Sequence, residues 1–251
     1  YTVDTPVPYR ISDLLAALVT RLGSLENKAK LHTYRSLKAR IEAVVFDPRY
    51  AFMFGKLTID DRMSSVLGQL FRIPIKDKSI TIVEIAGFPS EIVDSLVSVL
   101  CRLAFDLGVW SDGKVPTVVV CEEAHRYVPA DRGRGFGPTK RAISRIAKEG
   151  RKYGIFLGVI SQRPSELDPT ILSQCNSLIT MRLANDHDHS IVRAAVSDAA
   201  SSMLEFLPSL GSREAIAFGD AVAMPMRLRF GELPPNRMPK SLMRLSGAVD
   251  I

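Results

Sequence analysis

The stretch TVVVCEEAH, residues 117–125, joins a short apolar run to a pair of acids. The run is β-branched and predicts a buried strand of a parallel sheet. Glu122 and Glu123 then leave the strand at its carboxyl end, which is the edge where open α/β sheets bind their ligands. Adjacent residues at a strand end point in different directions, and the two carboxylates therefore suit two separate tasks.

Paired acids in this position have a defined chemistry in nucleotide hydrolases. The first acid, Glu122, would hold a magnesium ion directly or through water, and the second, Glu123, would polarise the attacking water. The alternative is a pair of solvated acids that cap the following helix. Spacing alone leaves both interpretations open. The interpretation as a hydrolase site makes Glu122 the candidate magnesium ligand and Glu123 the candidate catalytic residue.

A second polar feature follows the next predicted strand, residues 155–160. This strand ends in Ser161-Gln162-Arg163-Pro164, and neighbouring parallel strands bring their carboxyl ends to one edge. An amide both donates and accepts hydrogen bonds, so Gln162 is suited to touch a γ-phosphate and the attacking water. The alternative is that this glutamine only opens a loop.

Residues 138–152 form a predicted helix with two distinct faces. One face carries an apolar stripe at the i, i+3, i+4 and i+7 spacing of a helix: Ile143, Ile146, Ala147 and Gly150. A second face carries a basic stripe: Arg141, Arg145, Lys148 and Lys152, with Arg151 beside it. The basic stripe is either a solvated helix face or a surface between subunits that presents an arginine to a neighbour's phosphates. In the second case, Gly150 would let the other surface approach Arg151 closely.

The rest of the chain places these features in an alternating order of strands and helices. Strands are predicted at residues 79–85, 116–121, 155–160 and 177–183, with helices at 90–107, 138–152 and 169–174 between them. A hairpin is predicted from residues 214–218 and 222–230 around Gly219-Asp220. The pattern predicts an α/β fold with a mainly parallel sheet that helices bury on both faces.

Helices precede the sheet and a proline-rich tail follows it. Three helices are predicted at the start: at residues 11–22, at 31–46, and from Asp60 or Asp61 to near Leu70. We therefore divide the chain into a helical segment at 1–75, an α/β core at 76–230 and a tail at 231–251.

Composition excludes several classes of protein. The 251 residues are 46% hydrophobic and 24% charged, which excludes disordered and fibrous chains. The three cysteines lie far apart, without zinc-site spacing or a disulfide framework, so we expect a cytoplasmic protein. The longest apolar stretch, residues 92–110, is interrupted by charges and predicts a buried helix rather than a membrane span. A net charge of +6 suits a polyanionic partner.

Three strings resemble the HerA/FtsK superfamily of hexameric DNA-translocating ATPases, and the HerA branch most closely. They are EEAHRYVP at 122–129, IAKEGRKYG at 146–154 and ISQRPSELDPTILSQCN at 160–176. The segment ITIVEIAGFPSE at 80–91 and the predicted hairpin extend the similarity over most of the chain. One such string alone would be unspecific, whereas three in this order are specific.

The resemblance implies a RecA-like fold of the P-loop NTPase type, ATP and Mg²⁺ as cofactors, a homo-hexameric ring and DNA threaded through its centre. By position, Glu122 matches the metal-side acid, Glu123 the catalytic acid and Gln162 the sensor. Arg151 matches an arginine finger. Many relatives work with a nuclease or another effector protein, which makes such a protein a candidate partner. The resemblance gives no membrane partner.

Two further residues are candidates for binding the nucleotide. Glu84 lies at the end of the strand predicted at 79–85 and faces the same edge as Glu122, although a structural hydrogen bond is an equally good role for it. Arg163 follows Gln162 in the string that resembles the family.

The sequence departs from the family at two places. The metal-side acid is usually aspartate, and the extra methylene of Glu122 moves its carboxylate by about 1.5 Å, which favours contact with the metal through water. A glycine-rich loop with Gly-Lys followed by Ser or Thr is missing, because Leu57 follows Gly55-Lys56 and Val115 follows Gly113-Lys114. We expect that loop on an upstream part of the protein, and we expect this chain alone to be inactive.

These features predict the C-terminal part of a motor domain that couples ATP hydrolysis to DNA translocation or unwinding. Two alternatives share the fold: a motor for secretion or conjugation, and a non-hydrolysing assembly module with a decayed acid pair. DNA-stimulated turnover separates the first two functions, and ATP turnover of any kind excludes the third.

Overall fold

The computed structural model describes residues 10–23, 28–48, 63–74, 76–131, 133–196 and 201–237. The chain divides into two compact units, residues 1–81 and 82–251. None of the helices in the described ranges has the length and apolar character that crossing a bilayer requires.

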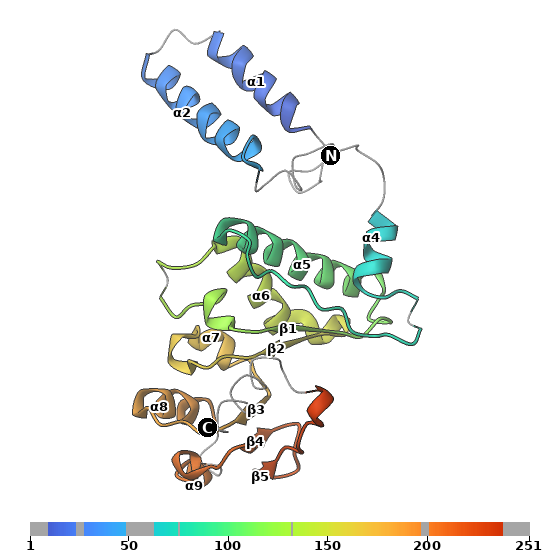
Figure 1. The fold of residues 1–251 in the computed structure, drawn as a ribbon, viewed down its shortest axis with the longest axis vertical. Helices are drawn as coiled ribbons and strands as arrows, with labels where there is room; N and C mark the ends of the chain where they lie inside the picture. The colour runs from blue at the N-terminus through green and yellow to red at the C-terminus, as the bar shows by residue number, and fades with distance from the viewer. Residues whose placement is uncertain are drawn as a thin grey trace, which may run out of the picture. The chain divides into compact units, whose positions relative to one another are not determined.

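The described part of the first unit is helical as far as Leu70. Its helices are α1 (Ile11–Gly23), α2 (Lys28–Val45) and α4 (Met63–Leu70). The helices predicted at residues 11–22 and 31–46 are confirmed, and α1 and α2 lie side by side (Figure 1). The predicted capping residues Asp60 and Asp61 lie outside the described residues.

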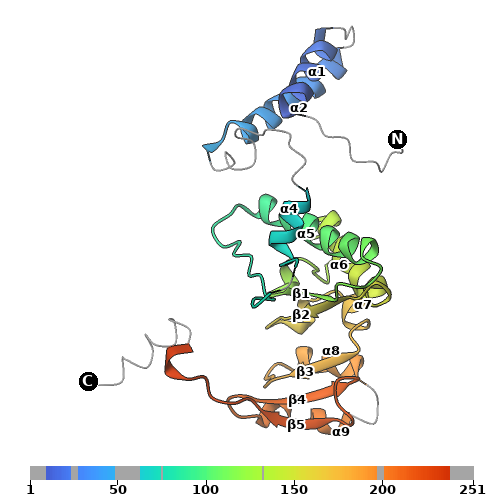
Figure 2. The same cartoon turned by 90° about the vertical axis from the view of Figure 1, so that its right-hand side faces the viewer.

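The second unit contains two of the predicted parallel strands. β1 (Thr117–Cys121) and β2 (Ile155–Val159) pair with each other in parallel. The connection between them contains α6 (Gly137–Glu149), and α5 (Ser90–Trp110) precedes β1. Both helices cover the same face of the strand pair (Figures 1 and 2). The α/β fold class and these four elements are therefore confirmed.

The core of this strand pair lies on the face that α5 and α6 cover. In β1, Val119 and Cys121 pack into the core, whereas Val118 and Val120 are 62% and 57% exposed. This alternation follows from the two-residue period of a strand. The expectation of a sheet buried on both faces is wrong for the described residues, because α5 and α6 lie on one face only.

The first predicted strand, residues 79–85, does not form. Ile80 and Ile82 are 76% and 81% exposed, and Ile85 packs against the edge of the core. A β-branched run becomes a strand only where a neighbour supplies the ladder of backbone hydrogen bonds. None of the described strands pairs with this segment. Its high β-propensity alone therefore does not produce a strand.

A second, antiparallel sheet follows the parallel pair. Its strands are β3 (Ser177–Thr180), β4 (Glu214–Gly219) and β5 (Met226–Arg229), in the order β3-β4-β5. The prediction that residues 177–183 continue the parallel sheet is wrong, because β3 pairs antiparallel with β4 and not with β2. β4 is the central strand and is buried over most of its length.

The antiparallel sheet has its own apolar core. The helical elements that contribute to it are α8 (Asp186–Ala195), α9 (Ser201–Leu204) and η6 (Leu207–Ser209). Ile216 of β4 is fully buried there. A short helix, α7 (Pro169–Leu172), precedes β3, as predicted. Of the predicted tail, residues 231–237 are described and end in η7 (Pro235–Arg237).

The predicted hairpin is confirmed, and a turn starts at Gly219-Asp220, where Val222 donates its N–H to the Gly219 carbonyl at 3.1 Å, but the second strand begins only at Met226. The last pair of the β4–β5 ladder is Ala217 with Met226, so a longer connection joins the strands. Gly219 has a positive φ of 86° and lies against the Asn176 carbonyl, with which a Cβ would overlap. The glycine is needed for the close approach of β4 to the start of β3.

Candidate active site

The turn after β1 sets the direction of both predicted acids. Glu122 and Glu123 are exposed at the carboxyl end of the strand, and Glu123 has the left-handed backbone angles φ 48° and ψ 45°. A non-glycine residue is disfavoured there by about 1–2 kcal/mol. A backbone bond helps to offset this cost, since buried Ala124 donates its N–H to the Ile160 carbonyl at 2.9 Å. The turn is therefore fixed to the end of the neighbouring strand.

Glu123 and Gln162 meet across the two strand ends. The Gln162 amide Nε2 donates to Glu123 Oε1 at 2.7 Å. The other carboxylate oxygen, Oε2, lies 3.5 Å from His125 Nδ1, and the same nitrogen lies 3.2 Å from Ser161 Oγ. The predicted catalytic acid and the predicted sensor are in direct contact. His125 and Ser161 also belong to this cluster. The sequence places them close to Glu123 and Gln162 along the chain but carries no other signal of this contact.

The loops after β1 and β2, residues 122–130 and 160–168, are joined beyond the site, and we call them the paired loops. Two backbone hydrogen bonds join them, from Ala130 N to Glu166 O at 2.8 Å and from Asp168 N to Val128 O at 2.9 Å, and together they form a β-bridge between Pro129 and Leu167. The Lys140 ammonium of α6 lies 2.7 Å from Asp168. Partial burial opposes ionisation of Asp168, but hydrogen bonds from Lys140 and Thr170 hold its pKa below the ordinary value.

Arg163 has its own carboxylate partner. Its Nη1 lies 2.7 Å from Glu166 Oε1, and this hydrogen bond raises the pKa of the guanidinium. Its backbone N–H donates to Ser161 Oγ at 3.0 Å. The side chain is 64% exposed. Its contact with a nucleotide stays a prediction.

Glu84 does not lie at a strand end. It is exposed on the unpaired segment 79–85, so the strand that was expected to aim it at the edge beside Glu122 does not exist. A contact between Glu84 and a nucleotide also stays a prediction.

Glu122 is the candidate metal ligand. Mg²⁺ prefers oxygen ligands, keeps several waters and is commonly bound through one or two carboxylates together with substrate phosphates. The exposed carboxylate of Glu122 at the strand edge fits that donor set. Within the described ranges, no three acidic, histidine or cysteine side chains gather into a site that could hold a metal ion. Glu122 therefore fits a magnesium ion whose other ligands are water and phosphate oxygens.

Gly113-Lys114 ends a helix and does not form a phosphate-binding loop. Gly113 has a positive φ of 72° and donates its N–H to the Gly108 carbonyl at 3.0 Å, which closes the last turn of α5. The other pair, Gly55-Lys56, lies outside the described residues.

The helix α6 leads into the predicted arginine finger. Its apolar stripe is confirmed, with Ile143 and Ile146 buried in the core. Arg151 is exposed in η3 (Gly150–Tyr153), which follows α6 directly. The expectation that Gly150 admits another subunit is wrong. Gly150 is buried, and a Cβ there would overlap with the Ile155 carbonyl of the same chain.

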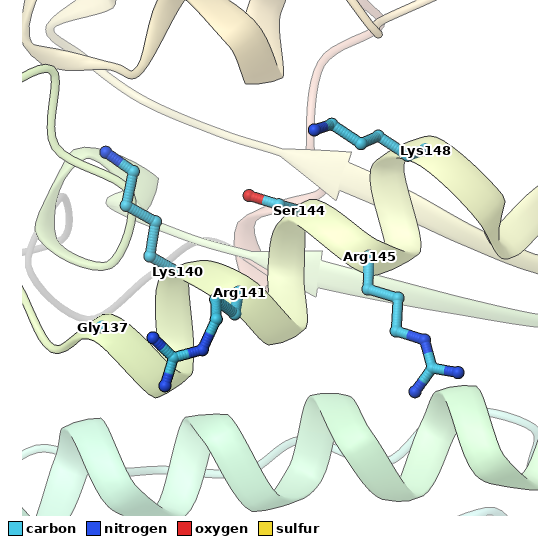
Figure 3. A pocket seen from close by; sticks show the side chains of 6 residues that line it. All are labelled: Gly137, Lys140, Arg141, Ser144, Arg145 and Lys148. Atoms are coloured by element: carbon cyan, nitrogen blue, oxygen red, sulfur yellow. The ribbon is translucent and has the colours of Figure 1, made fainter.

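A basic groove runs along the outside of α6 (Figure 3). Its volume is about 480 Å³, and it is lined by Gly137, Lys140, Arg141, Ser144, Arg145 and Lys148. Arg141 and Arg145 extend toward α5, where the Arg145 guanidinium lies 4.0 Å from the centre of the Phe105 ring. Lys140 and Lys148 extend from the other side of the helix. The lining has four basic side chains, of which Lys140 pairs with Asp168 at 2.7 Å and Arg145 with Glu149 at 4.0 Å.

The acid and the amide meet at the carboxyl ends of neighbouring parallel strands, the edge where open α/β sheets bind their ligands. Comparison with known families narrows the class of protein. Residues 1–104 match the family described as helicase HerA, central domain. The chain is therefore similar to HerA helicases, as its motifs predicted.

Two curated relatives show how far the similarity extends. The DNA double-strand break repair helicase HerA of Pyrococcus furiosus is 39% identical over 114 residues, which are 45% of this chain and 20% of that protein. A probable helicase of Methanocaldococcus jannaschii is 28% identical over 221 residues, which are 86% of this chain and 41% of the relative. The chain therefore spans less than half the length of either protein.

Among solved structures, the genome packaging NTPase B204 of Sulfolobus turreted icosahedral virus 2 in complex with AMPPCP is similar at a TM-score of 0.43 and 15% identity. The alignment covers 56% of this chain and 63% of that one.

Proposed function

We propose that this chain carries the catalytic acid and the sensor of a RecA-like motor that couples ATP hydrolysis to translocation or unwinding of DNA. The observation that carries the proposal is the 2.7 Å hydrogen bond from Gln162 Nε2 to Glu123 Oε1 across two neighbouring parallel strand ends. The relatives named as a DNA repair helicase and a probable helicase support it.

Each site residue has a separate task in this proposal. Glu123 orients the attacking water and accepts its proton. Gln162 turns away from Glu123 and donates to the transferred phosphoryl group. Glu122 would hold Mg²⁺ through water, and the bound ion would neutralise charge on the phosphates. Arg151 of one subunit reaches the nucleotide of the next subunit in the ring.

The basic groove on α6 suits the polyanionic partner. Its cations are Lys140, Arg141, Arg145 and Lys148, and contacts of lysine and arginine with phosphates supply most of the affinity of proteins for nucleic acids. The ring is a homo-hexamer in this proposal, and a nuclease or another effector protein is the candidate partner, in keeping with the resemblance to HerA.

The test is the substitution Glu123→Gln in the full-length protein. It keeps the shape of the side chain and removes the charge that orients water, so ATP binding should persist while turnover is lost. The matched control is Glu205→Gln, because Glu205 is exposed after α9 and lies outside the paired loops. DNA-stimulated hydrolysis by the wild type and by the control is the expected result.

Three outcomes contradict parts of the proposal. Hydrolysis by Glu123→Gln within about tenfold of wild type, or about 1.4 kcal/mol in the barrier, contradicts the catalytic assignment. Wild-type turnover that DNA does not stimulate indicates a motor for another substrate. Absence of wild-type turnover indicates an assembly module.

A further inference from the structure

The Glu123 carboxylate has a different partner on each oxygen. Oε1 accepts from Gln162 at 2.7 Å, and Oε2 faces His125 Nδ1 at 3.5 Å. His125 lies in η2 (Ala124–Arg126), the single helical turn after the acids. Its Nδ1 is also 3.2 Å from the hydroxyl of Ser161, the residue before Gln162. One imidazole nitrogen therefore contacts both of the paired loops.

The neighbours of His125 decide where its proton lies. A carboxylate only accepts hydrogen bonds, so the contact with Glu123 is attractive only when Nδ1 carries a proton. Ser161 Oγ already accepts from the Arg163 N–H at 3.0 Å, and its other lone pair can accept from Nδ1. We assign the proton to Nδ1, because an N–H there can be shared between Glu123 Oε2 and Ser161 Oγ, both of which can accept it.

Glu123 needs a second hydrogen-bond partner, because Gln162 turns away from it in the proposed function. Its side chain is 49% exposed, and ordering a long side chain of this kind costs about 1.5–2 kcal/mol in rotamer entropy. In the proposed function, Gln162 turns from Glu123 toward the phosphoryl group. His125 is then the side-chain partner that the described residues still offer to the carboxylate.

We propose that His125 is the positioning residue that fixes the Glu123 carboxylate through its Nδ1–H while Gln162 contacts the phosphoryl group, and that Ser161 fixes the imidazole. This inference rests on the proposed function. His125 touches the acid and not the reacting atoms, so its effect on the reaction is exerted through Glu123. Its side chain is only 21% exposed, which restricts the ring to few orientations.

The test compares two amide substitutions of His125 in the full-length protein. In His125→Asn, the amide nitrogen takes the place of the imidazole Nδ1, whereas in His125→Gln it reaches toward the place of Nε2, away from Glu123. We expect His125→Asn to keep kcat within about threefold of wild type. We expect His125→Gln to lower kcat by about tenfold or more with KM for ATP unchanged, because the lost interaction acts on the attacking water and not on nucleotide binding.

A merely structural role for His125 gives a different pattern. Both amides would then lower the midpoint of urea unfolding and leave the kcat of the folded protein alone. Equal kcat values for His125→Asn and His125→Gln overturn the proposal. Ser161→Ala adds a second check, because it should lower kcat less than His125→Gln does while leaving KM unchanged.

The reference variant Glu123→Gln separates this inference from the function on which it rests. If Glu123→Gln hydrolyses ATP like wild type, the proposed function fails, and the role of His125 fails with it. If Glu123→Gln is inactive while both His125 variants turn over normally, the role of His125 alone fails.

Discussion

The paired loops and the central strand β4 belong to the same compact unit but use their residues in opposite ways. In the paired loops, Glu123 and Arg163 leave 49% and 64% of their side chains exposed and are held by polar neighbours. In β4, residues 215–218 are at most 3% exposed and pack into an apolar core. The comparison predicts that substitutions in the loops change turnover and not stability, and that substitutions in β4 do the reverse.

The largest effect is expected at Arg151, which is exposed just before β2, at the opposite end of the strand pair from the paired loops, and has no part in the apolar core. An arginine finger that acts on a neighbour's nucleotide is worth about 10³–10⁵ in rate. Arg151→Ala subunits and Glu123→Gln subunits should each be inactive alone. Mixed rings should regain hydrolysis at interfaces that pair an intact Arg151 with an intact Glu123.

ATP turnover is measured across mixing ratios in rings whose mixed composition native mass spectrometry establishes. The control is Arg193→Ala, since Arg193 is exposed on α8, and this variant should turn over normally. No recovery in mixed rings would count against action between subunits.

The next effect concerns stability and tests the other side of the comparison. Ile216→Ala removes a fully buried side chain from β4 and should lower the free energy of unfolding by about 2–5 kcal/mol. Val118→Ala, on the exposed face of β1, should change it by about 0.5 kcal/mol or less. Urea unfolding measures both. Similar losses for the two variants would mean that other parts of the protein bury Val118.

Gly150→Ala tests whether the contact between the end of α6 and β2, next to Arg151, is as tightly packed as β4. The new Cβ would overlap with the Ile155 carbonyl, and forcing an extra carbon into such a contact costs about 1–3 kcal/mol. The matched control is Gly231→Ala, because nothing lies within 4 Å of a Cβ at Gly231. Unfolding midpoints of the two variants should differ clearly. An unchanged midpoint for Gly150→Ala would show that the helix end can move away from β2.

The smallest effect is expected where the paired loops do contribute to stability. Asp168→Asn keeps an N-capping residue for α7 but removes the ion pair with Lys140, and it should cost about 1 kcal/mol near neutral pH. The folded pKa of Asp168 is lowered. Its stabilisation is therefore present above the ordinary value of about 3.9 and is lost as the pH falls through the lower folded value.

The measurement is urea unfolding of wild type and Asp168→Asn near pH 7 and again near pH 3. The difference between the two proteins should shrink toward the lower pH. A difference that stays constant would show that the charge of Asp168 does not contribute to it.

The sequence predicted the elements whose signal is local. α5, β1 and β2 lie where apolar periodicity placed them. The sequence did not predict which strands pair. The segments 79–85 and 177–183 both have the residues of a parallel strand, but the first pairs with none of the described strands and the second pairs antiparallel with β4.

The contacts in the candidate site also divide into those that the sequence predicts and those that it does not. Glu123 and Gln162 could be predicted as neighbours, because the ends of adjacent parallel strands share one edge. The contact of His125 with Glu123 and Ser161 could not, because it depends on the left-handed turn at Glu123, which no local pattern of residues signals.

The contacts between the paired loops also limit how their lengths can change. Ala124 is tied to Ile160 and Val128 to Asp168, so an extra residue between these anchors would shift the acid relative to the amide. Beyond the last anchor, the chain around Gly133 is exposed before α6 begins. An epitope or a fluorescent label inserted there would lengthen neither loop. We expect such a tagged protein to keep its activity, so that it could be followed in an assembly.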